Sequence, residues 1–324
     1  MLDYSVIIRT TGKAGEKYAR LLKSIENLNP QPKEIIVVLP EGYTPPKESL
    51  VKEKIYYCPK GMVIQRLHGI QQCTTRYALI TDDDIAFEPD FISKLYTPLV
   101  DGKYGFSAGP LLDFFPKPGV QTICSALIGA AMPTFFHKER YNTILKTTGY
   151  SFNRKIKVGS KQLYETQSAP WTCFFADMEA MKAIHFEDEL WLDKHGYSAH
   201  DDTTMFYKAW LCGRKAVIVS DAFYEHLDAG TSRKENYEKV EYSNGFNTVV
   251  FWHRFLYSQE KGVKKLWCQA CLEYRIFVQK MFNFMNAIRG KMTKTERKAF
   301  STGVAAGKVW IKSEEYATIL PIKH

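Results

Sequence analysis

Short, almost wholly apolar runs constrain the fold of this 324-residue chain more than any other feature. Residues 4–9 (YSVIIR), 34–39 (EIIVVL) and 77–81 (YALIT) are such runs. Strands that are buried on both faces of a parallel sheet read as continuous apolar runs of this kind. The three runs therefore predict strands at the centre of a parallel sheet.

Helical segments separate these runs. The sequence predicts helices over residues 16–28 and 62–73, and a short strand over residues 55–57. Further along, residues 201–212 predict a helix and residues 216–219 another strand. Strands that alternate with helices predict an α/β fold, with a Rossmann-like, mostly parallel sheet flanked by helices.

Three adjacent carboxylates, those of Asp82, Asp83 and Asp84, directly follow the run at residues 77–81. In open α/β sheets, ligands bind beyond the carboxyl ends of the strands, which is where this triplet falls. Adjacent carboxylates repel one another, and a bound cation relieves the repulsion. Mg²⁺ and Mn²⁺ prefer oxygen ligands. The triplet therefore favours a divalent-cation site over the alternative, which is a solvated acidic turn.

A second acidic pair, Asp201 and Asp202, starts the predicted helix that Gly213 ends. Carboxylates at a helix N-terminus can act only as caps that interact favourably with the helix dipole. In a cleft, one of them can instead act as a general base. The residues by themselves leave both interpretations open.

Together these segments resemble the GT-A fold of the family 2 glycosyltransferases. The resemblance covers roughly residues 4–230. It rests on the opening strand Ser5–Thr11, the arginine-containing segment Gln65–Ile70, the Asp-x-Asp segment Leu79–Ile85 and the pair Asp201-Asp202. The spacing back from Gly213 matches Asp202 to the catalytic Asp of the family and Asp201 to the preceding Glu. The pair His200-Asp201 is a second possible match.

The resemblance implies an inverting enzyme that transfers a sugar from a nucleoside-diphosphate sugar to an acceptor hydroxyl, in polysaccharide or glycolipid assembly. Asp202 and Asp201 would form the catalytic pair, and which of them is the base stays open. The resemblance implies that Mn²⁺ or Mg²⁺ is bound by Asp82, Asp84 and His226. It implies that the nucleotide sugar is bound by Arg9, Thr10, Thr11, Glu41, Arg66, Asp82 and Asp83. Glu41 departs from the acidic pair usual in the family, so the base of the donor stays open.

Two competing functions fit some of the same residues. A sugar-phosphate nucleotidyltransferase also combines a nucleotide-binding α/β sheet with a metal, but its glycine-rich phosphate loop is poorly matched by residues 10–15 (TTGKAG). A non-catalytic nucleotide-sugar-binding module is the other alternative. Retention of Asp82, Asp84 and Asp202 argues against it.

Charge divides the chain at about residue 232. Residues 1–232 carry 27 basic and 27 acidic side chains, whereas residues 233–324 carry 17 basic and 8 acidic ones. We therefore predict a GT-A domain over residues 1–232 and a mainly helical, basic extension over residues 233–324. Within the first, residues 1–105 would form the nucleotide-sugar-binding half and residues 106–232 the acceptor-side half.

The basic residues of the extension are concentrated between Lys261 and Lys298, where ten Lys and Arg alternate with aromatic and apolar side chains. This segment either packs on the catalytic core as a helical subdomain or lies on an anionic membrane surface. Nucleic acid is the least favoured partner, because the first 232 residues are neutral. The expected partners are a nucleotide-sugar donor and a carbohydrate or lipid-linked acceptor.

The expected location is the cytoplasm, with possible peripheral contact at the inner face of the membrane. The seven scattered cysteines suit a reducing compartment. The longest nearly apolar run, residues 123–136, is shorter than the roughly 20 residues of a membrane-spanning helix.

The sequence of residues 150–167 predicts a mobile loop. The stretches 154–161 and 229–239 are candidate lids over the site.

Overall fold

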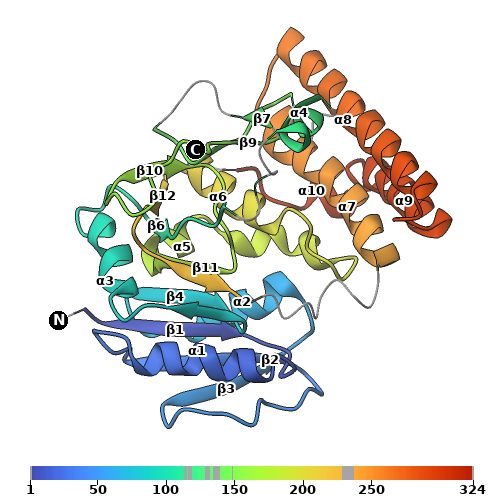
Figure 1. Cartoon of the computed structure of the whole chain (residues 1–324). Coiled ribbons are helices and arrows are strands. Elements are labelled where there is room, and N and C mark those ends of the chain that lie inside the picture. Colours follow the sequence, from blue (N-terminus) through green and yellow to red (C-terminus); the bar gives the residue numbers. More distant parts are fainter. Residues whose placement is uncertain are drawn as a thin grey trace.

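The computed structural model describes residues 2–112, 115, 119–127, 132–133, 139–147, 149–227 and 237–322. An eight-stranded sheet lies at its centre, in the strand order β10-β12-β6-β11-β4-β1-β2-β3 (Figure 1). Four parallel strands form one half of this sheet: β1 (Tyr4–Arg9), β2 (Glu34–Pro40), β3 (Glu53–Cys58) and β4 (Tyr77–Asp82). The apolar runs are therefore the central strands, as predicted.

The other half of the sheet mixes strand directions. It contains β6 (Phe106–Ala108), β10 (Leu163–Thr166), β11 (Cys173–Asp177) and β12 (Ala216–Val219). Strand β11 is antiparallel to both β4 and β6, whereas β12 is parallel to β6. Strand β10 pairs antiparallel to β12 within the segment that was predicted to be a loop, so that prediction is wrong there. Its exposed Leu163 and buried Tyr164 show the alternation of an edge strand, which the surrounding lysines obscured.

Helices cover both faces of the sheet. They are α1 (Glu16–Glu26), α2 (Met62–Gln72), α3 (Phe91–Tyr96), α5 (Met178–Ala183) and α6 (Asp201–Leu211). Helix α4 (Val120–Leu127) lies instead beside the short strand β7 (Met132–Pro133). Successive residues of a strand point to opposite faces, so Ile7 joins the core under α2 while Ile8 joins the core under α1. Gly69 allows α2 to lie close to the sheet, because a Cβ atom there would be 2.4 Å from Cγ2 of Ile7.

Two small sheets complete this part of the chain. Strands β5 (Ile85–Phe87) and β13 (Tyr224–His226) pair antiparallel, which places His226 opposite Ile85 and beside the acidic triplet. Strands β7 (Met132–Pro133), β8 (Asn142–Thr143) and β9 (Ser151–Phe152) form a second small sheet in the order β7-β9-β8.

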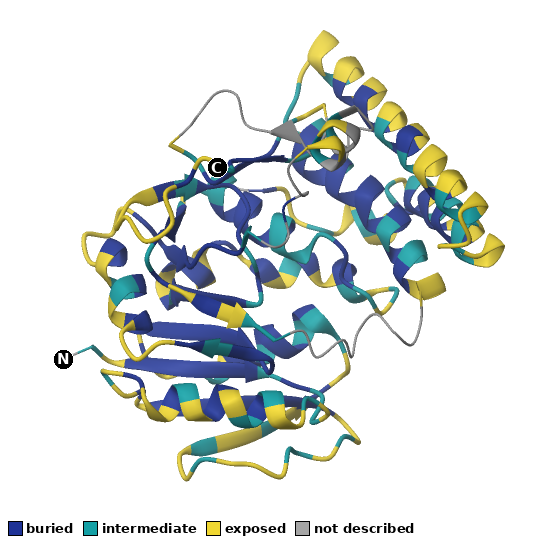
Figure 2. Cartoon of the chain, viewed as in Figure 1, coloured by how far each residue is buried: buried dark blue, intermediate teal, exposed yellow. Residues whose placement is uncertain are grey.

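The C-terminal part is helical, as predicted. It contains α7 (Tyr237–Phe251), a π-helical segment (Trp252–Tyr257), α8 (Val263–Ile288), α9 (Lys294–Trp310) and α10 (Glu314–Ala317). Helix α7 is buried between the core and α9, whereas α8 lies on the outer edge with one face exposed (Figure 2). No helix in the described ranges combines the length and apolar character needed to cross a bilayer.

A buried ion cluster joins the helical part to the rest of the chain. Arg254 of the π-helical segment donates through Nε and Nη2 to the two carboxylate oxygens of Glu189, both at 2.7 Å. Nζ of Lys208, on α6, lies 2.7 Å from the same carboxylate. Burial raises the pKa of Glu189, but the two cations more than offset this, and the pKa is lowered. The π-helical segment that follows α7 thus packs on the core through a compensated charge.

Candidate active site

The carboxylate of Asp82, at the end of β4, is held by two guanidinium groups. Oδ1 of Asp82 accepts from Nε of Arg9 at 3.0 Å and from Nη2 of Arg66 at 2.7 Å. The register of the parallel strands places Arg9 directly beside Asp82. Burial raises the pKa of Asp82, but Arg66 and Arg9 more than offset it, so that the pKa is lowered. Asp82 is therefore an ionised group whose charge is already compensated by protein cations.

Arg66 connects this carboxylate with the second acidic pair. It lies on α2 with 1% of its surface exposed, and its guanidinium carbon is 4.7 Å from the centre of the Trp171 ring. Its Nη1 lies 3.6 Å from Oδ2 of Asp201. Two acidic segments that are far apart in the sequence thus meet at one buried cation.

Asp193 fixes the start of the helix that carries Arg66. Its carboxylate accepts from the backbone N–H groups of Met62, Val63 and Ile64, at 2.8–2.9 Å. The first N–H groups of a helix have no partner within the helix, so this acceptor satisfies them and offsets the positive end of the helix dipole. Asp193 was not predicted as a site residue, because it lies 131 residues beyond Met62 and leaves no local capping signal.

Asp83 is bound to the loop after β1. The hydroxyl of Thr10 donates to Oδ2 of Asp83 at 2.5 Å and accepts from the backbone N–H of Gly12 at 2.8 Å. Burial raises the pKa of Asp83 to about 6. Asp83 therefore links the carboxyl ends of β1 and β4, where a ligand of the sheet is expected.

Asp84, which directly precedes β5, lies beside His226, the last residue of β13. Nε2 of His226 is 3.5 Å from Oδ1 of Asp84, and the backbone N–H of Leu227 donates to the Asp84 carbonyl at 2.8 Å. A carboxylate and an imidazole are suitable donors for a divalent cation that takes its other ligands from phosphate and water. Within the described ranges, no group of three His, Cys, Asp or Glu side chains is close enough to hold a metal by itself. The pair therefore fits a cation that is shared with a substrate.

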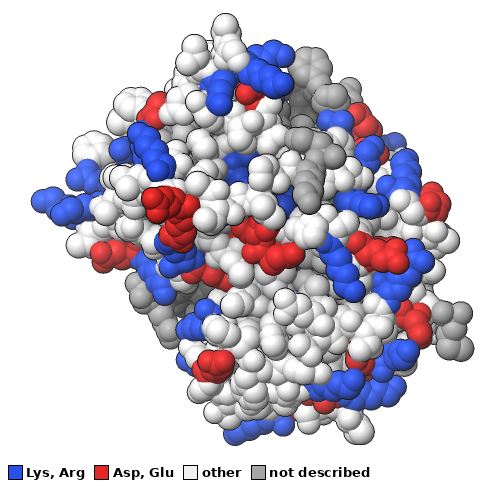
Figure 3. All heavy atoms as spheres, turned by 180° about the vertical axis from the view of Figure 1, so that it is seen from behind, with Lys and Arg blue, Asp and Glu red and all other residues white. Residues whose placement is uncertain are grey.

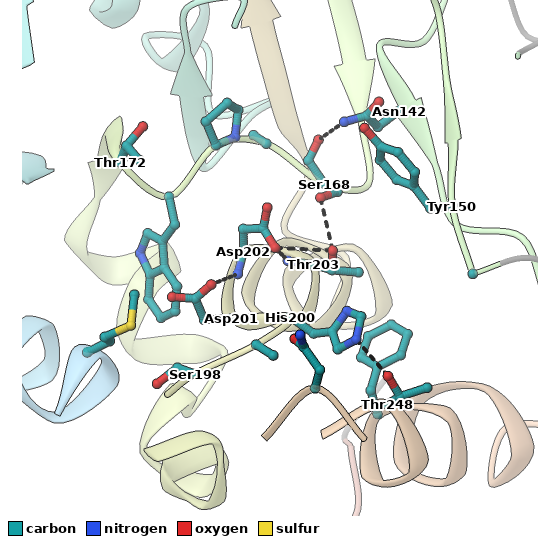
Figure 4. Close-up of a pocket in the computed structure, with 18 of the residues that line it drawn as sticks. Asn142, Tyr150, Ser168, Thr172, Ser198, His200, Asp201, Asp202, Thr203 and Thr248 are labelled. Carbon is teal, nitrogen blue, oxygen red and sulfur yellow. Dashed lines mark hydrogen bonds between the residues drawn. The ribbon is translucent and has the colours of Figure 1, made fainter. Parts of the chain in front are cut away.

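Asp201 and Asp202 occupy the first turn of α6. Figure 4 shows their carboxyl groups diverging, with that of Asp202 nearer Ser168. Oδ1 of Asp202 accepts from the N–H of Thr203 at 2.6 Å, while Oδ1 of Asp201 accepts from the N–H of Asp202 at 2.9 Å. Burial raises the pKa of both acids, that of Asp201 to about 7. Both capping and a raised proton affinity are thus present at this pair.

His200 is tied to the helical extension. Its backbone is left-handed, with φ 68°, and its Nε2 lies 3.0 Å from Oγ1 of Thr248 on α7 (Figure 4). Its ring stacks on Phe251 at 5.9 Å. Burial lowers the pKa of His200 to about 4, so the ring is neutral near pH 7. The neutral, hydrogen-bonded ring of His200 therefore stabilises the turn that precedes α6.

Two cavities lie next to the cluster of Arg9, Arg66 and Asp82: Arg66 and Asp82 line the first, and Arg9 lines the second. The first has a volume of about 440 Å³ and contains Arg66, Asp82, Asp201 and Asp202 in its wall. Aromatic side chains also line it, namely Phe115, Tyr141, Tyr150, Trp171, Tyr197, Phe251 and Trp252. This cavity therefore places the second acidic pair next to flat apolar surfaces.

The second cavity, of about 470 Å³, holds most of the predicted nucleotide residues. Arg9, Thr10, Thr11 and Asp83 line it. Lys13, Lys60 and Lys239 also line it, and the ammonium groups of Lys13 and Lys60 lie 5.5 and 5.0 Å from the centre of the Tyr43 ring. The cavity is thus basic and carries an aromatic face.

Some predicted residues lie elsewhere. Glu41 is exposed, and its backbone N–H donates to the Cys58 carbonyl at 2.9 Å. The described residues that line the two cavities do not include Glu41, Asp84 or His226. Of the candidate lids, residues 229–236 lie outside the described residues, and Gly159 is bonded through its N–H to the Ser220 carbonyl at 2.7 Å.

Comparison with known proteins gives the class of this fold. Residues 5–159 match the family described as "Glycosyl transferase family 2", and no curated protein matches the chain in sequence. GalNAc-T7, solved with UDP, GalNAc and Mn²⁺, matches with a TM-score of 0.50 and 12% identity, over 99% of this chain and 58% of its own. This chain thus spans less than two thirds of that protein.

Two further structures are similar at lower scores. The mannosyltransferase PcManGT from Pyrobaculum calidifontis, in complex with GDP-Man and Mn²⁺, has a TM-score of 0.46 and 12% identity, over 96% of this chain and 88% of its own. Residues 1–349 of S. aureus TarS, in complex with UDP-GlcNAc, have a TM-score of 0.43 and 11% identity, over 95% and 92%.

The sheet order and the similarity to the GalNAc-T7 structure define the class of this fold, which is GT-A. More particularly, the sequence of residues 5–159 is similar to that of glycosyl transferase family 2.

Proposed function

We propose that this protein is an inverting glycosyltransferase that transfers a sugar from a nucleoside-diphosphate sugar to an acceptor hydroxyl. The observation that carries the proposal is the position of Asp202 in the same cavity as Arg66 and Asp82. In this proposal the base shares a cavity with the Arg66 guanidinium at the end of the central strands. In this proposal residues 1–105 bind the donor, residues 106–232 form the acceptor side, and residues 233–324 are the extension.

The basic cavity is the proposed nucleotide site. Its lysines, Lys13, Lys60 and Lys239, suit a diphosphate, and the ring of Tyr43 offers a face for the base. Thr10, Thr11 and Asp83 line the same wall. Met62 lines both cavities, so a donor lying across it would direct its sugar toward Arg66 and Asp82.

Asp84 and His226 are the proposed ligands of a divalent cation, Mn²⁺ or Mg²⁺. The cation would supply positive charge that offsets the charge on the departing diphosphate. Asp82, predicted as a third ligand, already accepts from Arg9 and Arg66. We therefore assign Asp82 mainly to holding these two cations close to the phosphates.

Asp202 is the proposed general base and Asp201 a positioning residue. Oδ2 of Asp201 lies 3.6 Å from Arg66, whereas the hydrogen bonds of the Asp202 carboxylate come from Thr203. Asp202 would accept the proton of the acceptor hydroxyl as its oxygen attacks the anomeric carbon, opposite the departing diphosphate. The raised pKa of the pair makes it a stronger base than an exposed carboxylate.

The acceptor is proposed to be a carbohydrate, free or linked to a lipid, in polysaccharide or glycolipid assembly at a membrane. Aromatic faces such as those of Tyr150, Trp171 and Trp252 suit the apolar faces of sugar rings. Two buried donors in this wall, Nε of Arg66 and Nε1 of Trp171, find no partner among the described residues. Buried donors are normally paired, so a bound hydroxyl group would satisfy them.

A panel of nucleotide sugars, screened for thermal stabilisation with and without Mn²⁺, tests the proposal. One donor should raise the melting temperature in a Mn²⁺-dependent manner, and its slow hydrolysis should release a nucleoside diphosphate. Release of pyrophosphate from a sugar phosphate and a nucleoside triphosphate would instead identify a nucleotidyltransferase. Stabilisation without any turnover on a panel of acceptors would identify a binding module.

A further inference from the structure

The outer face of α8 is apolar along its length. Trp267, Tyr274, Phe277, Met281, Phe284 and Ile288 have exposed fractions between 44% and 71%. Their spacing of seven, three, four, three and four residues places them in one stripe along the helix. Exposed apolar residues are ordinary when they are scattered, but a continuous stripe marks an interaction surface.

The opposite face of α8 is already used for packing. Cys268, Leu272 and Ile276 are buried in the core, and the carbonyl of Cys268 accepts from Nε1 of Trp252 at 3.0 Å. Packing on the core therefore does not require the outer stripe. A helix that is apolar on both sides is expected to be covered on both sides.

The charges around the stripe are nearly all positive. Lys264, Lys280 and Arg289 are exposed on α8 and at its end. The sole acid within α8, Glu273, is bound by Nζ of Lys308 on α9 at 2.7 and 2.8 Å. Seen from behind, blue side chains are frequent along the upper and left edges of the molecule, whereas most red ones lie across the middle of this face (Figure 3).

We propose that α8 docks the protein on an anionic lipid bilayer, with the Trp267-to-Ile288 stripe inserted among the lipids. Lys264, Lys280 and Arg289 would then lie at the level of the phosphate headgroups. The inference gives the membrane contact of the proposed function a specific surface. The inference rests on the proposed function, because membrane docking would bring the protein to the surface at which a lipid-linked acceptor is presented.

A second copy of this chain fits the surface less well. Two stripes packed face to face would bring Lys264, Lys280 and Arg289 near the same side chains of the partner. With Glu273 already engaged, few acids are present to compensate them. Like charges along the edges of a helix pair oppose association, whereas an anionic bilayer is attracted to each of them.

Vesicle sedimentation of the full chain tests this surface. Phosphatidylcholine vesicles, with and without phosphatidylglycerol, would be compared at low and high salt. The substitutions Phe277→Glu and Ile288→Glu, made together, should lower partitioning onto the anionic vesicles about tenfold or more. High salt should weaken the binding of the wild type. Val51→Glu with Val100→Glu is the matched control, because it changes two exposed apolar residues far from α8 and adds the same charge.

Several outcomes would overturn the proposal. The wild type could fail to bind anionic vesicles at low salt. The α8 variant could bind them as strongly as the wild type, or the control variant could lose as much binding as the α8 variant. A wild-type dimer that the α8 variant converts to monomer, without vesicle binding, would assign the stripe to self-association. Donor-induced thermal stabilisation is measured in parallel and should be unchanged in the α8 variant. Failure of the proposed function would remove that stabilisation from the wild type and leave vesicle binding intact.

Discussion

Nη2 of Arg66 lies 2.7 Å from Oδ1 of Asp82, and neither residue exposes more than 6% of its surface. Removing one partner of such a buried ion pair lowers the free energy of unfolding more than removing one partner of a surface pair. The remaining charge has little access to water and loses much of its compensation. Several expected results follow from this pair and from the acids around it.

Replacing Arg66 should destabilise the protein strongly. We expect Arg66→Ala to lower the free energy of unfolding by about 3–5 kcal/mol, because Asp82 would keep only Arg9 as a partner. The matched control is Arg76→Ala, which breaks an ion pair to Asp177 whose arginine side chain is 59% exposed. That control should cost at most about 1 kcal/mol. Urea unfolding measures both, and equal losses would contradict the assigned role of Arg66.

The Arg66 effect should also depend on pH. The pKa of Asp82 is lowered from 3.8 in the folded state, so its contribution is present above 3.8 and is lost as pH falls through the lower value. The stability difference between wild type and Arg66→Ala should therefore shrink in acid below that pH. A difference that stays constant there would show that Arg66 stabilises the fold only through packing.

Asp201 should lower stability at neutral pH. Its pKa is raised from 3.8 to about 7, so the folded chain binds more protons than the unfolded chain between these values, and stability falls as pH rises. Asp201→Asn removes this dependence. Relative to wild type, the variant should gain about 1–3 kcal/mol between pH 4 and pH 8. Asp3→Asn, at a side chain that is 66% exposed, should show a flat difference and serves as the control.

Loss of the proposed base should reduce turnover without abolishing donor binding. We expect Asp202→Asn to lower kcat by roughly 10²–10⁴-fold, because a positioned base contributes about that factor. Asp201→Asn should have a smaller effect on kcat. In the wild type, the rate should rise with pH through a value above the ordinary range of an aspartate, since burial raises the pKa of both acids. Near-complete transfer by Asp202→Asn would refute the assignment.

The effect of Mn²⁺ on nucleotide binding should depend on Asp84 and His226. Titration calorimetry of Asp84→Ala should show binding of the nucleoside diphosphate that Mn²⁺ no longer strengthens, and His226→Ala should weaken the Mn²⁺ effect. Glu88→Ala changes a nearby carboxylate that is 59% exposed and should leave the effect intact. If Mn²⁺ still strengthened nucleotide binding by Asp84→Ala as it does in the wild type, the metal would have to be bound by other residues.

The sequence predicted those parts of the fold that local pattern determines. The apolar runs at residues 4–9 and 77–81 are buried strands, as predicted, and their parallel order brings Arg9 and Asp82 to one edge. Strand β10 was missed, because its burial comes from pairing with β12 and not from its own composition. In the site, Asp82, Asp202 and Arg66 follow from the family resemblance. Asp193 and the lysines of the basic cavity are set by contacts between distant segments, which a single sequence does not reveal.

The ion cluster of Glu189, Lys208 and Arg254 has a consequence for how the protein meets its surroundings. It joins the π-helical segment after α7 to the core, and α8 begins a short connection later, at Val263. Whatever captures α8 therefore also sets the direction in which the acidic cavity opens. A protein held in that way would sample hydroxyl groups only at a fixed height above the capturing surface. Choice among acceptors would then depend on the length of the stalk that presents the sugar as well as on the sugar itself.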